Sequence, residues 1–277
     1  MSLERASLNQ YTVKPLSLIE AADACVRHHI PSIALWRDKI AETGAKRAAE
    51  EIVARGLRVS SICRGGFFPT GSADEKKARY DDNLRAIDEA AILAADVLVL
   101  VCGPPIGRDL SGARAQIEDG IASLVPYART ANVKLGIEPL HPMLLAKRSA
   151  ITTLSEANDL VDALGAKDVV GVVVDAYCVF WDAQVEREIA RAGETIFSYQ
   201  VADWVTPDGY EDVAAGRAMM GDGCIDFARL GSSIESASYT GPIEIEVLNS
   251  RLWTENQDNV VRLAVERYNQ FVAEACV

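Results

Sequence analysis

Residues 169–177 have the sequence Val-Val-Gly-Val-Val-Val-Asp-Ala-Tyr, an almost unbroken apolar run that ends near a carboxylate. Such runs are typical of parallel strands whose two faces are both covered by other elements. The run 97–103 has the same character. Short apolar, β-branched runs recur along the chain, and together they predict eight strands: residues 6–12, 32–36, 58–63, 97–103, 134–140, 169–177, 196–202 and 242–248.

Stretches with helical periodicity separate these strands. Ser17 and Glu20 have the spacing of a capping box at the start of the first helix, and Thr254 and Gln257 have it before the last, which we expect to end near residue 275. Further helices are predicted over residues 44–55, 81–95, 116–130, 154–164, 181–192 and 225–236. Eight strand–helix units in 277 residues predict an α/β fold, one (β/α)8 TIM barrel domain over residues 1–277. The alternative, an open doubly wound sheet, usually carries a glycine-rich phosphate loop that this sequence lacks.

The composition excludes some classes of function. Lys and Arg total 28 against 40 Asp and Glu, so the net charge is −12 and the chain lacks the basic character of nucleic-acid-binding or membrane-surface proteins. The six cysteines lie far apart without a C-x-x-C pair, which favours reduced thiols in a core. The first residues do not resemble a signal peptide, and the longest apolar run, 97–102, is too short to span a bilayer. We therefore expect a cytoplasmic protein.

Polar side chains stand at the ends of four successive predicted strands: Glu138, Asp175, Gln200 and Glu246. In a TIM barrel the carboxyl ends of the strands carry the active site, so these groups should meet at one rim. Oxygen donors of this kind suit Mg²⁺ or Mn²⁺, and a divalent cation would offset the repulsion between the carboxylates. Glu244 shares a strand face with Glu246 and is the alternative ligand; otherwise we expect it to be buried lower down, paired with a basic residue.

Five segments together resemble the xylose isomerase-like barrel superfamily, which includes sugar phosphate isomerases and epimerases: G-I-E-P, V-V-V-D, Y-Q-V-A-D-W, G-R-A-M-M-G-D-G and I-E-I-E-V-L. The resemblance covers about residues 8–272. It implies that Glu138, Asp175, Gln200 and Glu246 bind the metal and that Glu138 and Glu246 also form the acid/base pair. It further implies that Arg217 contacts the substrate.

Two positions depart from the epimerase pattern, because Gln200 and Cys178 stand where histidines are common. Cys178 then takes the place of a substrate contact. His141, three residues after Glu138, is a candidate general base because the ordinary pKa of imidazole is near neutrality. The segment Glu138-Pro-Leu-His141-Pro with a Gln ligand is also similar to the catalytic subunits of bacterial C-glycoside deglycosidases. Those enzymes act on 3-oxo-glycosides with manganese and a small partner subunit.

The four tryptophans, Trp36, Trp181, Trp204 and Trp253, lie at or near the ends of predicted strands. Sugar rings stack against aromatic faces, so Trp36 and Trp181 are candidate substrate contacts. The alternative for each is ordinary packing between the barrel and its helices. Asn9, Gln10 and Arg64 are further candidate contacts to hydroxyl groups.

We therefore predict a divalent-metal-dependent sugar isomerase or epimerase that removes a proton next to a carbonyl and passes through a metal-stabilised enediolate. A metal-dependent lyase, either a C-glycoside deglycosidase or a dehydratase, is the alternative if the same intermediate expels a substituent. A barrel that binds a sugar or a partner without catalysis is the alternative of another class. We expect a small-molecule sugar or polyol substrate, no nucleic-acid or membrane partner, and either a homo-oligomer or a small partner subunit.

Overall fold

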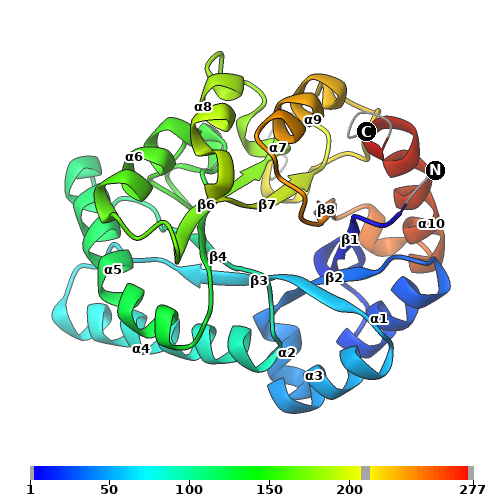
Figure 1. Cartoon of the computed structure of the whole chain (residues 1–277), viewed down its shortest axis with the longest axis horizontal. Coiled ribbons are helices and arrows are strands. Elements are labelled where there is room, and N and C mark those ends of the chain that lie inside the picture. The colour runs from blue at the N-terminus through cyan, green and yellow to red at the C-terminus, as the bar shows by residue number, and fades with distance from the viewer. Residues whose placement is uncertain (1–2, 207–212, 274–277) are drawn as a thin grey trace.

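The computed structural model describes residues 3–206 and 213–273. Its eight strands form one closed parallel barrel in sequence order, with helices around the outside (Figure 1). The strands are β1 (Ala6–Asn9), β2 (Ser32–Trp36), β3 (Arg58–Gly66), β4 (Leu98–Val101), β5 (Leu135–Ile137), β6 (Val170–Asp175), β7 (Ile196–Val201) and β8 (Ile243–Ile245). This arrangement confirms the predicted (β/α)8 fold.

The helices are α1 (Leu18–Arg27), α2 (Arg37–Thr43), α3 (Ala45–Ala54), α4 (Ala73–Ile92), α5 (Leu110–Thr130), α6 (Leu154–Leu164), α7 (Ala176–Val179), α8 (Val185–Ala192), α9 (Phe227–Ser236) and α10 (Gln257–Tyr268). The capping box of Ser17 and Glu20 is present at α1. The capping box predicted at Thr254 is wrong, because the side chain of Asn256 caps α10 by accepting from the backbone N–H of Asn259. Likewise α4 begins earlier than predicted, since Ser72 caps it.

The strands have the burial expected of a barrel core. Every residue of β4, β5, β6 and β7 is buried, which explains their apolar runs. Buried polar residues interrupt the apolar strands, and the strand register pairs Asp175 of β6 with Gln200 of β7 and Gln200 with Glu244 of β8. The barrel therefore supports a short row of polar groups across three neighbouring strands. Within residues 3–206 and 213–273, no helix is both long and apolar enough to cross a membrane.

Candidate metal and active site

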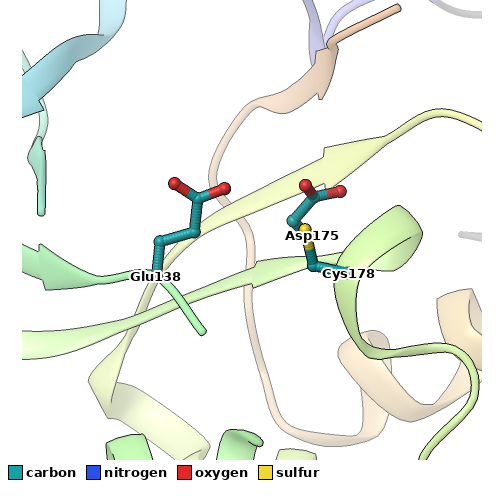
Figure 2. Close-up of side chains that lie close together, drawn as sticks. All are labelled: Glu138, Asp175 and Cys178. Carbon is teal, nitrogen blue, oxygen red and sulfur yellow. The ribbon is translucent and has the colours of Figure 1, made fainter. Parts of the chain in front are cut away.

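Three potential metal ligands converge beyond the carboxyl ends of β5 and β6. Glu138 directly follows β5, Asp175 ends β6, and Cys178 lies on α7, the single turn that follows. Each offers one atom, and these atoms all lie within 4.8 Å of one another. Figure 2 shows the two carboxylates extending to the same side of their strands, with the thiol beside Asp175. Cys178, predicted as a substrate contact, thus lies among the candidate metal ligands.

Arg217 links two of the predicted ligands. Its Nη1 lies 2.9 Å from Oδ2 of Asp175 and 2.9 Å from Oε2 of Glu246. The Arg217 side chain is buried, and its guanidinium lies over the ring of Tyr177, with Cζ 4.6 Å from the ring centroid. The guanidinium therefore supplies positive charge between two carboxylates that would otherwise repel each other.

Gln200 and Glu244 are joined by a hydrogen bond. Nε2 of Gln200 donates to Oε1 of Glu244 over 3.2 Å, whereas Oε1 of Gln200 is buried and has no hydrogen-bond partner among the described residues. Glu244 also accepts from Asn9 at 2.6 Å and from Ser61 at 2.8 Å. These donors are neutral, so the basic partner expected for a buried Glu244 is not found among the described residues. Because the amide nitrogen of Gln200 is bonded to Glu244, its amide oxygen Oε1 is the Gln200 atom that remains available as a metal ligand.

Burial and mutual repulsion raise the pKa values of the clustered glutamates. The pKa of Glu138 rises to about 8, chiefly through burial and then through the charge of Asp175. The pKa of Glu244 rises to about 6 through burial, although its hydrogen bonds oppose the shift. Burial also raises the pKa of Glu246 well above its ordinary value, against the attraction of Arg217. The fold thus gathers carboxylates whose ionised forms are costly without a further cation.

The donor set fits a divalent cation. Oε1 of Gln200 is a buried oxygen without a hydrogen-bond partner among the described residues, and Glu138 and Asp175 each present a carboxylate oxygen within 4.8 Å of the thiol of Cys178. Buried polar atoms normally have partners, so such groups mark a place where one is missing. Both carboxylate oxygens of Glu246, in contrast, have hydrogen-bond partners: Asn9 donates to its Oε1 at 3.0 Å and Arg217 to its Oε2 at 2.9 Å.

His141 belongs to an aromatic cluster beside the site. Its ring stacks on Trp204 with the centroids 4.2 Å apart, and it lies 6.0 Å from Trp181, edge to face. Nδ1 of His141 accepts from the backbone N–H of Met143, and burial lowers the pKa of the imidazole. A neutral ring that accepts at Nδ1 carries its proton on Nε2, so this nitrogen is a hydrogen-bond donor.

Trp36 belongs to a second aromatic cluster. Its ring stacks on Tyr11 with centroids 3.6 Å apart, and Trp253 meets Tyr11 edge to face. Nε1 of Trp36 donates to Oδ1 of Asn9 over 2.9 Å. The two tryptophans predicted as substrate contacts, Trp36 and Trp181, therefore lie in separate clusters, and both are partly exposed.

Asn9 has a larger part in the site than the sequence indicated. Its Nδ2 donates to both Glu244 and Glu246, while its Oδ1 accepts from Trp36 and from the backbone of Tyr11. We expected only a hydroxyl contact at this position. Ser61, which donates to Glu244, was not foreseen. Both are polar residues on strands, but Ser7 on β1 and Ser60 and Arg64 on β3 are polar too, so the sequence pattern alone does not single them out.

A broad depression of about 800 Å³ lies at the opposite end of the barrel. Arg58, Lys134 and Ile196 line it, and these residues lie at the amino ends of β3, β5 and β7. The amino-terminal end of a TIM barrel contributes to stability, whereas the chemistry lies at the other end. The carboxylate cluster is therefore the candidate active site.

Comparisons with known proteins identify relatives of this chain. The chain is 24% identical over 216 residues to L-ribulose-5-phosphate 3-epimerase UlaE of Salmonella paratyphi A, covering 74% of this chain and 68% of the relative. It is 29% identical over 155 residues to 3-dehydroshikimate dehydratase of Pseudomonas aeruginosa, covering 55% of this chain and 23% of that protein. Its relatives thus include sugar epimerases and a dehydratase.

Two solved structures are similar along almost the whole chain. The crystal structure of protein SMc04130 from Sinorhizobium meliloti 1021 has a TM-score of 0.94 and 41% identity, covering 98% of this chain and 99% of that one. A structure of the IOLI protein with a bound zinc atom has a TM-score of 0.85 and 16% identity, with 98% and 99% covered. The family model for the xylose isomerase-like TIM barrel matches residues 22–270. The chain therefore belongs to the xylose isomerase-like TIM barrel family.

Proposed function

We propose that this protein is a divalent-metal-dependent sugar isomerase or epimerase. One observation carries the proposal: Glu138 and Asp175 converge with Cys178 at the carboxyl end of the barrel, Arg217 joins Asp175 to Glu246, and Gln200 lies beside Asp175 in the strand register. The sugar epimerases among its relatives support the same class of reaction.

Glu138, Asp175, Gln200 and Glu246 would hold the metal, with Cys178 as a further donor. The oxygen ligands favour Mn²⁺ or Mg²⁺, whereas the thiol and the zinc atom in the IOLI structure favour a softer ion. When bound, the cation would polarise the substrate carbonyl and so lower the cost of removing a proton from the neighbouring carbon.

Glu138 and Glu246 are the proposed acid/base pair. One carboxylate removes the proton next to the carbonyl, and the other returns a proton to the opposite face or to the adjacent carbon. Asn9 and Arg217 fix the orientation of Glu246. His141, with its proton on Nε2, donates a hydrogen bond to a substrate oxygen rather than acting as the general base first expected.

The aromatic clusters provide the sugar-binding surface. Trp181 and Trp204 pack around His141, and Trp36 lies over Tyr11 on the other cluster. Flat aromatic faces at the mouth of a barrel suit the apolar face of a sugar ring.

Calorimetric titration of Mn²⁺ into EDTA-stripped protein tests the site, with Glu246→Gln beside Glu244→Gln. We expect about one ion per chain for the wild type, binding at least tenfold weaker for Glu246→Gln, and a smaller change for Glu244→Gln. The two glutamates are both buried and lie two residues apart in the sequence, so each substitution controls for the other. Equal Mn²⁺ binding by wild type and Glu246→Gln would contradict the metal site.

A lyase is the second candidate, because the dehydratase of Pseudomonas aeruginosa is among the relatives. Removal of the same proton followed by loss of a β-substituent would give elimination in place of epimerisation. Incubating the metal-loaded protein with free ketoses and, separately, with 3-oxo-glycosides distinguishes the two. Interconversion of ketoses supports the isomerase, and release of the substituent supports the lyase.

A further inference from the structure

Three arginines at the barrel mouth lack carboxylate partners. Most arginines of the described chain form ion pairs, for example Arg37 with Asp82 and Arg129 with Asp168. Arg64, Arg79 and Arg148 form none within residues 3–206 and 213–273. The sequence contains 40 acidic residues against 28 basic ones, so unpaired arginines are unexpected here.

These three residues, which we call the arginine cluster, are neighbours in space. Cζ of Arg64 lies 3.9 Å from the ring centroid of Phe67, and Cζ of Arg79 lies 5.7 Å from it. The carbonyl of Arg148 accepts from the backbone N–H of Gly103 at 3.0 Å. Gly103 lies directly against Phe67, since a Cβ at Gly103 would be 2.9 Å from Cα of Phe67. Phe67 is therefore contacted by the guanidinium groups of Arg64 and Arg79, and the backbone of Arg148 bonds to the residue that packs against it.

Electrostatics supports the same grouping. Burial lowers the pKa of Arg64 most, and the positive charges of Arg148, Arg79 and Arg37 lower it further. Arg37 is neutralised by Asp82 and Glu89, but Arg148 and Arg79 are not. Grouping like charges costs energy in the free protein, and an anion would recover that energy.

The arginine cluster adjoins the candidate active site. Arg64 follows Cys63 near the carboxyl end of β3, and Arg148 bonds to Gly103 just beyond β4. The next strand is β5, and the backbone of Glu138 at its end donates to Leu100 of β4 at 3.2 Å. Arg148 also contributes to the electrostatic environment of Glu138. A substrate placed at Glu138 could thus extend toward β3 and β4.

We propose that Arg64 and Arg148, with Arg79 at the rim, form an anion subsite that binds a phosphate or carboxylate group of the substrate. The planar guanidinium binds both groups through paired hydrogen bonds, and the face of Phe67 holds Arg64 in place. This inference rests on the proposed function, because it assigns the substrate class to the same site: sugars with an anionic substituent rather than neutral sugars.

The first test needs no turnover. Inorganic phosphate is titrated into the metal-free protein by calorimetry for the wild type, Arg64→Gln, Arg148→Gln and Arg262→Gln. Arg262 is an exposed arginine of α10 with a carboxylate 3.9 Å away, so it controls for the loss of one charge. We expect phosphate to bind wild type and Arg262→Gln alike, and roughly tenfold or more weaker to the two cluster variants. Arg148→Lys should recover part of the affinity.

The second test identifies the anion by kcat/KM for the metal-loaded enzyme on a neutral ketose, its phosphate ester and a keto-sugar acid. A preference for the ester indicates a phosphate subsite, and a preference for the acid indicates a carboxylate subsite. The preferred anionic substrate should lose its advantage over the neutral ketose in Arg148→Gln.

The two tests separate the failure of this inference from the failure of the proposed function. Phosphate binding that is equal in wild type, Arg64→Gln and Arg148→Gln would overturn the subsite even if ketoses are turned over. Arginine-dependent phosphate binding without turnover of any ketose would uphold the subsite and reject the isomerase.

Discussion

Cys178 is the residue that bears most directly on metal choice. Its thiol lies with Glu138 and Asp175 in the candidate site, and burial raises its pKa well above the ordinary value. Thiolates bind Zn²⁺ much better than Mn²⁺. We expect Cys178→Ser to weaken Zn²⁺ binding roughly tenfold and Mn²⁺ binding much less, as measured by competition with a chelating dye. Cys25→Ser, a buried cysteine on α1, is the control. Equal losses for both ions would show that the thiol does not select the metal.

Asn9 holds two buried glutamates through one amide group. Asn9→Asp replaces that donor with an acceptor of nearly the same shape, which leaves Glu244 and Glu246 facing a third carboxylate. We expect the free energy of unfolding of the metal-free protein to fall by about 2 kcal/mol or more, as measured by urea denaturation at pH 7. Asn132→Asp tests the same exchange at an exposed position. If the free energy of unfolding falls no more for Asn9→Asp than for Asn132→Asp, the bonds from Asn9 to Glu244 and Glu246 do not stabilise the fold as proposed.

At the scale of elements, a close approach between β6 and the start of β7 depends on Gly171. A Cβ at this position would lie 2.3 Å from the carbonyl oxygen of Thr195 and 2.7 Å from the ring of Phe197. The backbone must shift to accept alanine, so we expect Gly171→Ala to destabilise the protein by about 1–3 kcal/mol. Because Asp175 ends the same strand, Mn²⁺ affinity should fall as well.

Gly71→Ala provides the matched control for Gly171→Ala. Its added Cβ would meet only an oxygen of Glu75 at 3.6 Å, an ordinary contact. Thermal unfolding of both variants, with Mn²⁺ titration of each, makes the comparison. A stability of Gly171→Ala equal to that of Gly71→Ala would mean that the barrel relaxes around β6 without cost.

At the scale of the whole molecule, the buried glutamates couple stability to pH. Folding raises the pKa of Glu138 from 4.5 to about 8 and that of Glu244 from 4.5 to about 6. Between pH 4.5 and about pH 8 the folded metal-free protein binds more protons than the unfolded chain, so its stability falls as pH rises. We expect the unfolding temperature to drop by several degrees between pH 5 and pH 8.

Saturating Mn²⁺ should remove or reverse this pH dependence, because the cation binds the ionised carboxylates and stabilises only the folded protein. Scanning calorimetry at pH 5 and pH 8, with and without Mn²⁺, measures both effects. Glu138→Gln should flatten the metal-free profile. A metal-free unfolding temperature that rises steadily from pH 5 to pH 8 would contradict this account.

The sequence by itself determined the barrel. The apolar runs of β4 and β6 require cover on both faces, and their alternation with helices leaves few other folds. Strand ends are visible as polar residues after apolar runs, so the sequence alone indicates Glu138, Asp175, Gln200 and Glu246 as candidates. Helix starts were harder to predict, because several polar residues near Asn256 and Ser72 can serve as caps and local spacing does not decide among them.

Only the tertiary structure decided how the polar groups pair. It showed that Asn9 donates to both Glu244 and Glu246, that Arg217 bridges Asp175 and Glu246, and that Arg64, Arg79 and Arg148 lie near one another. These residues are far apart in the chain, and side-chain direction depends on barrel register and closure. Periodicity places a residue on a strand or helix, but the distance between two charges is set by the packing of distant segments.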